Sequence, residues 1–284
     1  MHGIATEPLV TVAELAAACA EPDLVIVDCR FDLGDPAAGR AAYLEAHIPG
    51  AHYADLARDL SGPPATDRGR HPLPPPARLA AVFSALGIET ATAVVAYDDS
   101  GGMIAARLWW MLRYLGHARI AVLDGGWQTW VSAGAAIASG DEPAAPRRFS
   151  AAPRPDRLVT LGEVAQSACL VDARAPARYR GEFEPIDKHA GHIPGARNHC
   201  WQNNLGPDGR FLERVTLERQ LAASLGILPD SATVHYCGSG VSACHNVLAQ
   251  VLAGLPEPRL YCGSWSEWCG DGGRPRAIGG ESAR

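Results

Sequence analysis

The chain has 284 residues, of which 47% are hydrophobic and 20% charged, and its formal net charge is −6 at pH 7. This length is large for one hydrophobic core and ordinary for two domains, and the acidic balance gives no positive field for nucleic acid or an anionic membrane. No stretch approaches the roughly 20 apolar residues of a membrane span, and no basic-then-apolar signal opens the chain. We therefore expect a cytoplasmic protein of two domains with no nucleic-acid or membrane partner.

The first half alternates short apolar runs with helical patterns. Thr11 followed by Glu14 is typical of a helix start with an acidic first turn. Three apolar runs predict strands, at residues 24–27, 93–96 and 120–123. A helix is expected at 105–115, directly after the second of them. Strands that are apolar along their whole length are buried on both faces, which predicts a parallel sheet with helices on either side.

A proline-rich segment then separates the two halves. Four prolines occur between residues 143 and 155, a composition typical of a linker with some stiffness. We therefore place an N-terminal domain at 1–140, the linker at 141–157 and a C-terminal domain at 158–284. In that last domain, strands are expected at Leu170-Val171 and 233–236 and a helix at 243–252.

The halves are related by an internal repeat. The run 27–30 recurs at 171–174, the run 47–51 at 192–196, and the run 94–101 aligns with 233–240. Ordered matches of this kind indicate a duplication. The last alignment sets Asp98 against Cys237, so only the second half carries a thiol at this position.

Cys237 is the candidate nucleophile of the chain. It ends an apolar run and opens the loop formed by Cys237, Gly238, Ser239, Gly240, Val241 and Ser242, which leads into the predicted helix. A strand, a tight loop and a helix start aim backbone N–H groups and the positive end of the helix dipole at one sulfur. A thiol of ordinary pKa, about 8.5, becomes a thiolate near neutral pH in that setting. The alternative is a small buried cysteine at a strand end.

The other cysteines give no sign of a metal or a disulfide framework. The eight cysteines form no Cys-x-x-Cys pair and no Cys/His cluster at zinc spacing. We expect neither a metal nor another cofactor. A long chain without an export signal favours reduced thiols.

The loop 237–241 resembles the active-site loop of the rhodanese-like sulfurtransferases, in particular the Cys-Gly-Ser-Gly-Val form of the 3-mercaptopyruvate enzymes. The resemblance covers nearly the whole chain and implies an α/β fold of two tandem rhodanese-like domains, each a parallel sheet flanked by helices. It further implies that Cys237 takes sulfur from 3-mercaptopyruvate as a persulfide, cradled by the N–H groups of residues 238–243, and passes it to a thiol, thioredoxin or cyanide. Asp98 cannot carry a transferable sulfur, so the first half is expected to be catalytically silent.

The resemblance also assigns residues outside the loop. Arg178 matches the arginine that binds the substrate carboxylate, a task suited to a forked guanidinium. A second family arginine would fall near Asp187 and Lys188, where this chain has none. Arg70 is expected to help hold the anion.

His71 matches the histidine of a family Ser-His-Asp relay whose serine is here Ser239. Such a relay can move a proton while the carbon–sulfur bond of the substrate breaks. The family aspartate aligns with Ala57, which lies between Asp55 and Asp59. The resemblance therefore leaves open which group orients His71.

Three other functions are alternatives for a loop of this kind. A cysteine phosphatase needs an arginine six positions after the cysteine, and Ala243 stands there. A thiosulfate:cyanide sulfurtransferase typically carries basic residues after the cysteine, where this chain has Gly238 and Ser239. A sulfur carrier or binding module without catalytic turnover is the third alternative.

Overall fold

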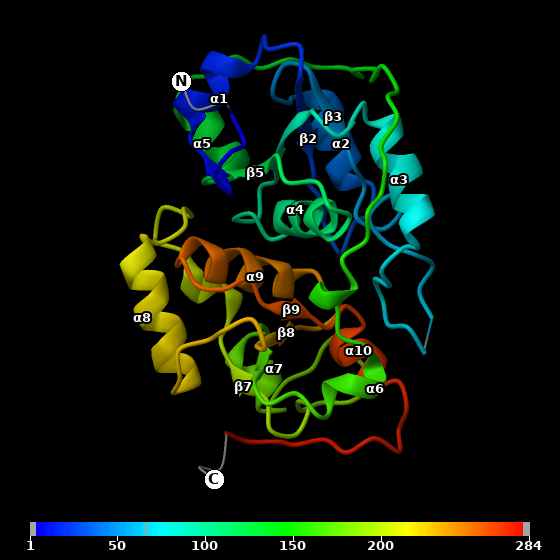
Figure 1. Cartoon of the computed structure of the whole chain (residues 1–284), viewed down its shortest axis with the longest axis vertical. Helices are drawn as coiled ribbons and strands as arrows, with labels where there is room; N and C mark the ends of the chain where they lie inside the picture. The colour runs from blue at the N-terminus through cyan, green and yellow to red at the C-terminus, as the bar shows by residue number, and fades with distance from the viewer. Residues whose placement is uncertain (1–3, 66, 281–284) are drawn as a thin grey trace. The chain divides into compact units, whose positions relative to one another are not determined.

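The structure is a computed structural model that describes residues 4–65 and 67–280 (Figure 1). The chain divides into two compact units. The first comprises residues up to 62 together with 74–154 and 208–210, and the second comprises 63–73, 155–207 and the chain from 211 onward. The segment 63–73 thus precedes the linker in sequence but belongs to the second unit, which also contains Cys237.

The first unit is built on a five-stranded parallel sheet of order β1-β5-β4-β2-β3. Its strands are β1 (Leu9–Val10), β2 (Leu24–Asp28), β3 (Ala51–Tyr53), β4 (Ala93–Tyr97) and β5 (Ile120–Leu123). Its helices are α1 (Val12–Ala18), α2 (Ala38–Glu45), α3 (Pro76–Ala85), α4 (Ala105–Tyr114) and α5 (Gly126–Ser132). Every residue of β4 is buried, as a central strand covered on both faces requires.

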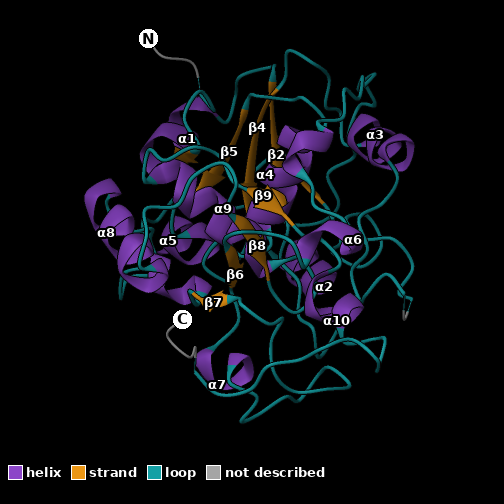
Figure 2. Cartoon of the chain, turned by 60° about the horizontal axis from the view of Figure 1, so that its bottom comes forward, coloured by secondary structure: helices purple, strands orange, loops and turns teal. Residues whose placement is uncertain are grey.

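The second unit holds a four-stranded parallel sheet of order β7-β6-β8-β9 (Figure 2). Its strands are β6 (Leu170–Asp172), β7 (Arg197–Asn198), β8 (Val234–Tyr236) and β9 (Arg259–Leu260). Its α-helices are α6 (Leu161–Val164), α7 (Pro176–Tyr179), α8 (Arg214–Leu225), α9 (Ser242–Leu252) and α10 (Ser264–Trp268), and it has two 3-10 turns, η1 (Pro155–Arg157) and η2 (Trp201–Asn204). The predicted fold, parallel sheets flanked by helices, is confirmed.

Local sequence signals explain where several elements begin. Thr11 Oγ1 accepts a hydrogen bond from the Glu14 N–H at 3.3 Å, and the Glu14 carboxylate accepts the Thr11 N–H at 2.8 Å. This reciprocal capping satisfies N–H groups that the first turn of α1 leaves unbonded. Thr160 and Glu163 form the same arrangement at the start of α6. The capping pattern therefore recurs at corresponding places in the two units.

The repeat is also visible in buried ion pairs at the ends of equivalent strands. Arg30 donates to Asp28 at the end of β2, and Arg174 donates to Asp172 at the end of β6, each with a shortest contact of 2.6 Å. All four side chains are buried, so each charge depends on its partner. Arg174 has a further partner, Glu184, at 3.2 Å, and this contact ties the second pair to the candidate site.

Within the described parts of the chain, no helix has the length and apolar character needed to span a membrane. The same residues contain no group of three or more His, Cys, Asp or Glu side chains arranged for a metal ion.

Candidate active site

Cys237 lies immediately after β8, at the carboxyl end of the sheet, where parallel α/β folds place their ligands. Its Sγ accepts a hydrogen bond from the Gly240 N–H at 3.2 Å, and its own N–H donates to Ser264 Oγ at 3.1 Å. The side chain is buried, with 2% of its surface exposed. Helix α9 begins at Ser242, so its first turn faces the sulfur.

This environment lowers the pKa of the Cys237 thiol. Burial raises the pKa, but hydrogen bonds from the Ser242 hydroxyl and from the N–H groups of Ser239 and Ala243 outweigh that effect. These donors stabilise the thiolate more than they stabilise the neutral thiol, so the pKa falls. A thiolate is the nucleophilic form of cysteine, so the loop prepares this sulfur for attack.

Two glycines allow the loop to take this shape. Gly240 has a φ of +77°, and a Cβ there would lie 2.3 Å from the carbonyl oxygen of Cys262. A Cβ on Gly238 would lie 2.9 Å from Nη2 of Arg70 and 3.6 Å from both terminal nitrogens of Arg178. Gly238 therefore lets two guanidinium groups approach the backbone next to Cys237.

The loop serine contacts the predicted histidine. His71 Nδ1 lies 2.8 Å from Ser239 Oγ, and the tautomer of the ring decides which of the two donates. Ser239 is 7% exposed. Asp55 and Asp59, which flank the position of the family aspartate, belong to the first unit. Asp55 Oδ1 there accepts the N–H groups of Ala57 and Arg58.

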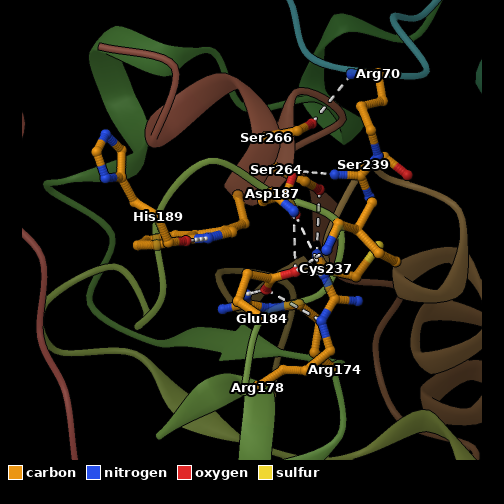
Figure 3. Close-up of polar contacts among 12 residues, drawn as sticks. Arg70, Arg174, Arg178, Glu184, Asp187, His189, Cys237, Ser239, Ser264 and Ser266 are labelled. Atoms are coloured by element: carbon orange, nitrogen blue, oxygen red, sulfur yellow. Dashed lines mark hydrogen bonds and ion pairs between the residues drawn. The ribbon is translucent and has the colours of Figure 1, made fainter. Parts of the chain in front are cut away.

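The two arginines at the loop are held by buried carboxylates (Figure 3). Arg178 donates to Glu184 through Nε at 3.1 Å and Nη2 at 2.6 Å, and to Asp187 at 3.2 Å. Arg70 Nη1 forms an ion pair with the other carboxylate oxygen of Asp187, and the Arg70 N–H donates to Ser266 Oγ at 3.1 Å. Asp187 thus stands between the guanidinium groups.

A pocket of about 350 Å³ opens beside these charges. Arg70, Asp187, Lys188, Ile186 and Cys269 are among the residues that line it. All of them belong to the second unit. The structure therefore brings together Cys237, Ser239, His71, Arg70 and Arg178 in one unit, and adds Asp187 and Glu184 to them.

The sequence profile of the Rhodanese-like domain matches residues 11–133 and again residues 156–271. The chain belongs to the rhodanese family. Both matches fall on the sheets described above, so this is a tandem rhodanese, as the internal repeat predicts.

Known relatives span nearly the whole chain. A probable 3-mercaptopyruvate sulfurtransferase of Pseudomonas aeruginosa is 49% identical over 278 residues, covering 95% of this rhodanese and 98% of the relative. A putative thiosulfate sulfurtransferase of Mycobacterium tuberculosis is 42% identical over 280 residues, covering 95% and 97%. The structure of a 3-mercaptopyruvate sulfurtransferase from Leishmania major superposes with a TM-score of 0.83 at 34% identity, covering 93% of this chain and 75% of that chain. The rhodanese described here is a sulfurtransferase enzyme.

Sequence reasoning missed three residues that shape this site. Ser264 Oγ accepts a hydrogen bond from the Cys237 N–H. The φ of Ser264 is +56°, a value that residues other than glycine rarely adopt. The repeat contained a signal for it, because Ser264 aligns with Gly126, whose φ is +57°. The sequence did not indicate the contacts of Glu184 and Asp187 with the arginines, because both carboxylates lie in an irregular loop that has no helix or strand periodicity.

Proposed function

We propose that the chain moves sulfur from 3-mercaptopyruvate to an acceptor through a persulfide on Cys237. The observation that carries this proposal is the buried sulfur whose pKa is lowered by the loop donors while two guanidinium groups stand at Gly238. A nucleophilic sulfur next to cations suits a donor that carries a thiol and a carboxylate.

In the proposed step, the Cys237 thiolate attacks the thiol sulfur of the donor. A sulfur–sulfur bond forms and the carbon–sulfur bond breaks, with its electron pair going to the enolate of pyruvate. The proton of the donor thiol ends on that carbon, which leaves a persulfide anion on Cys237. His71 and Ser239 move this proton, and Arg178 and Arg70 hold the donor carboxylate.

The persulfide then passes its outer sulfur to a thiol, thioredoxin or cyanide, and the Cys237 thiolate is restored. The N–H groups around the loop and the start of α9 stabilise negative charge in both forms. No cofactor takes part in this cycle. We place the enzyme in the cytoplasm, because a reducing compartment keeps Cys237 available as a thiolate.

Thiosulfate is the second candidate donor. The loop itself has no cation at Gly238 or Ser239, but Arg70 and Arg178 supply cations from other segments. Cations at this place attract an anionic donor, so thiosulfate is the alternative to 3-mercaptopyruvate.

The nucleophile is tested by intact-mass measurement after incubation with each donor. Wild type should gain about one sulfur atom, and Cys237→Ser should gain none and lose sulfur transfer, because a hydroxyl is not ionised by a helix terminus. Cys244→Ser is the matched control, since serine can keep the hydrogen bond that Cys244 donates to the Gly240 carbonyl. If Cys237→Ser kept a tenth of the wild-type rate, Cys237 would have no place in the mechanism.

The donor is tested by steady-state kinetics with 3-mercaptopyruvate and thiosulfate and a shared cyanide acceptor. Arg178→Ala should lower kcat/KM for 3-mercaptopyruvate by about 10- to 100-fold, the scale of a lost charge-assisted contact. A higher kcat/KM for thiosulfate in wild type, or indifference to Arg178→Ala, would reject 3-mercaptopyruvate as the preferred donor. Sulfur bound to wild type without turnover would indicate a carrier instead.

A further inference from the structure

Asp187 places a negative charge inside the anion-binding part of the site. Its carboxylate is 4% exposed and bridges Arg70 and Arg178, the two cations that approach Gly238 (Figure 3). Any anionic donor that binds these guanidinium groups must compete with this carboxylate for the same N–H donors.

Asp187 is not the residue that holds Arg178 in place. That task falls to Glu184, which takes two hydrogen bonds from Arg178 and also accepts the N–H groups of Ile186 and Asp187 at 3.1 and 3.0 Å. The side-chain contacts of Asp187, in contrast, are with the two guanidinium groups. Arg178 can therefore keep its position while Asp187 gives way.

The charges around the loop are balanced. Three arginines, Arg70, Arg174 and Arg178, are paired with three carboxylates, Asp172, Glu184 and Asp187. Arg174 and Asp172 are buried against each other, so the charge open to a donor is that of Arg70 and Arg178, reduced by Asp187. The paired arginines and carboxylates therefore leave no surplus of positive charge for a dianion, and Lys188 in the adjoining pocket is an exposed cation outside these pairs.

We propose that Asp187 sets the donor selectivity of this enzyme by penalising dianionic donors more than monoanionic ones. Coulomb repulsion scales with the product of the charges. The repulsion energy between Asp187 and a dianion such as thiosulfate is therefore roughly twice that between Asp187 and a monocarboxylate at the same place. Low exposure of Asp187 keeps water from screening this repulsion. This inference rests on the proposed function and names the charge class of its donor.

Asp187→Asn tests the proposal with the full-length enzyme. The substitution removes the charge and keeps the size, so kcat/KM for thiosulfate should rise relative to that for 3-mercaptopyruvate by about tenfold, mainly through KM. Asp187→Glu keeps the charge and should keep the wild-type ratio. Glu182→Gln is the matched control, because Glu182 is an exposed carboxylate of the same segment that pairs with Arg180. An unchanged ratio in Asp187→Asn, or an equal fall for both donors, would overturn the proposal.

A second measurement separates this proposal from the donor assignment. Cys237 is alkylated with iodoacetate, an anion, and with iodoacetamide, its neutral counterpart, and the modified residue is identified by mass spectrometry. Asp187→Asn should raise the ratio of the iodoacetate rate to the iodoacetamide rate about fivefold, and Glu182→Gln should not. This ratio does not depend on which donor the enzyme uses. If wild type turned over neither donor, the proposed function would fail, whereas an unchanged alkylation ratio would reject the role of Asp187.

Discussion

The loops after β4 and β8 are related by the repeat but hold their anions differently. In the first unit, the Asp98 carboxylate accepts the N–H groups of Ser100, Gly102, Ile104 and Ala105 at 2.7 to 2.8 Å. In the second unit, Cys237 Sγ accepts the Gly240 N–H at 3.2 Å. Both loops are anion cradles built from backbone donors. The first is filled by its own carboxylate, and the second holds a sulfur that can bond to another atom.

The comparison extends to the tryptophan whose backbone N–H donates to each loop. The Trp127 N–H donates to the Asp98 carbonyl at 2.8 Å, and the Trp265 N–H donates to the Cys237 carbonyl at 2.9 Å. The preceding residue is Gly126 in the first unit and Ser264 in the second, with the same positive φ. Only the serine adds a hydrogen bond to the loop, from the Cys237 N–H. In the second unit, a strained backbone at Ser264 therefore accompanies a hydrogen bond that helps to position Cys237.

The largest effect on this comparison is expected from Asp98→Ala. Removing the carboxylate leaves three buried N–H groups and the part-buried N–H of Ser100 without this acceptor, which should lower the free energy of unfolding by about 2–4 kcal/mol. Sulfur transfer per folded molecule should stay near the wild-type level. Thermal melting and kinetics check both statements, with Asp99→Ala, an exposed neighbour, as the control. Unchanged melting together with lost transfer would give the first loop a direct catalytic role.

The same variant has a defined pH dependence. Burial raises the pKa of Asp98 above 3.8, although its four N–H donors act to lower it. The folded protein then binds this proton more tightly than the unfolded chain does, so the stabilisation from Asp98 is greatest below about pH 3.8 and falls as the pH rises through its folded pKa. The difference in melting temperature between wild type and Asp98→Ala should therefore be largest below about pH 3.8 and narrow as the pH rises towards 7.

A smaller effect is expected from Ser242→Ala, which removes a donor to the Cys237 sulfur. Because that hydrogen bond helps to lower the pKa of the thiol, the alkylation of Cys237 should shift to higher pH. Its rate at pH 7 should fall roughly fivefold. Ser242→Thr retains the hydroxyl and should keep the wild-type profile. A profile that does not move in Ser242→Ala would mean that the backbone donors alone stabilise the thiolate.

The smallest effect concerns Ser264. Ser264→Ala loses the hydrogen bonds to the Cys237 N–H and the Tyr261 carbonyl and keeps the positive φ. Ser264→Gly loses the same bonds but relieves the backbone by about 0.5–1 kcal/mol. The melting temperature should be highest for wild type, slightly lower for Ser264→Gly and lowest for Ser264→Ala. The reverse order of the two variants would show that the backbone at Ser264 is not strained.

Local patterns in the sequence predicted much of the fold. The apolar runs at 24–27 and Leu170-Val171 each became a strand one residue longer, ending at Asp28 and Asp172. Both aspartates are buried because an arginine two positions later pairs with each of them. A charged residue inside a buried strand end breaks the apolar pattern, so periodicity alone could not place it there.

The site was less predictable where it depends on contacts between distant segments. The sequence showed that residue 187 is not an arginine, but nothing in it indicated that Asp187 pairs with Arg70, 117 positions away. Glu184 contacts Arg178 and Arg174 only six and ten positions away, but it lies in an irregular loop whose contacts leave no periodic signal. Ser264 differs, because the repeat aligns it with Gly126, whose φ is also positive.

The segment 63–73 belongs to the second unit, and this limits how the chain can be truncated. That segment carries Arg70 and His71, lies before the linker in the sequence and belongs to the unit that holds Cys237. A shortened gene that started at the linker would still encode the nucleophile and its loop, but without the histidine that contacts Ser239 or the cation at Gly238. Deleting everything before the linker would therefore remove part of the candidate site together with the first unit.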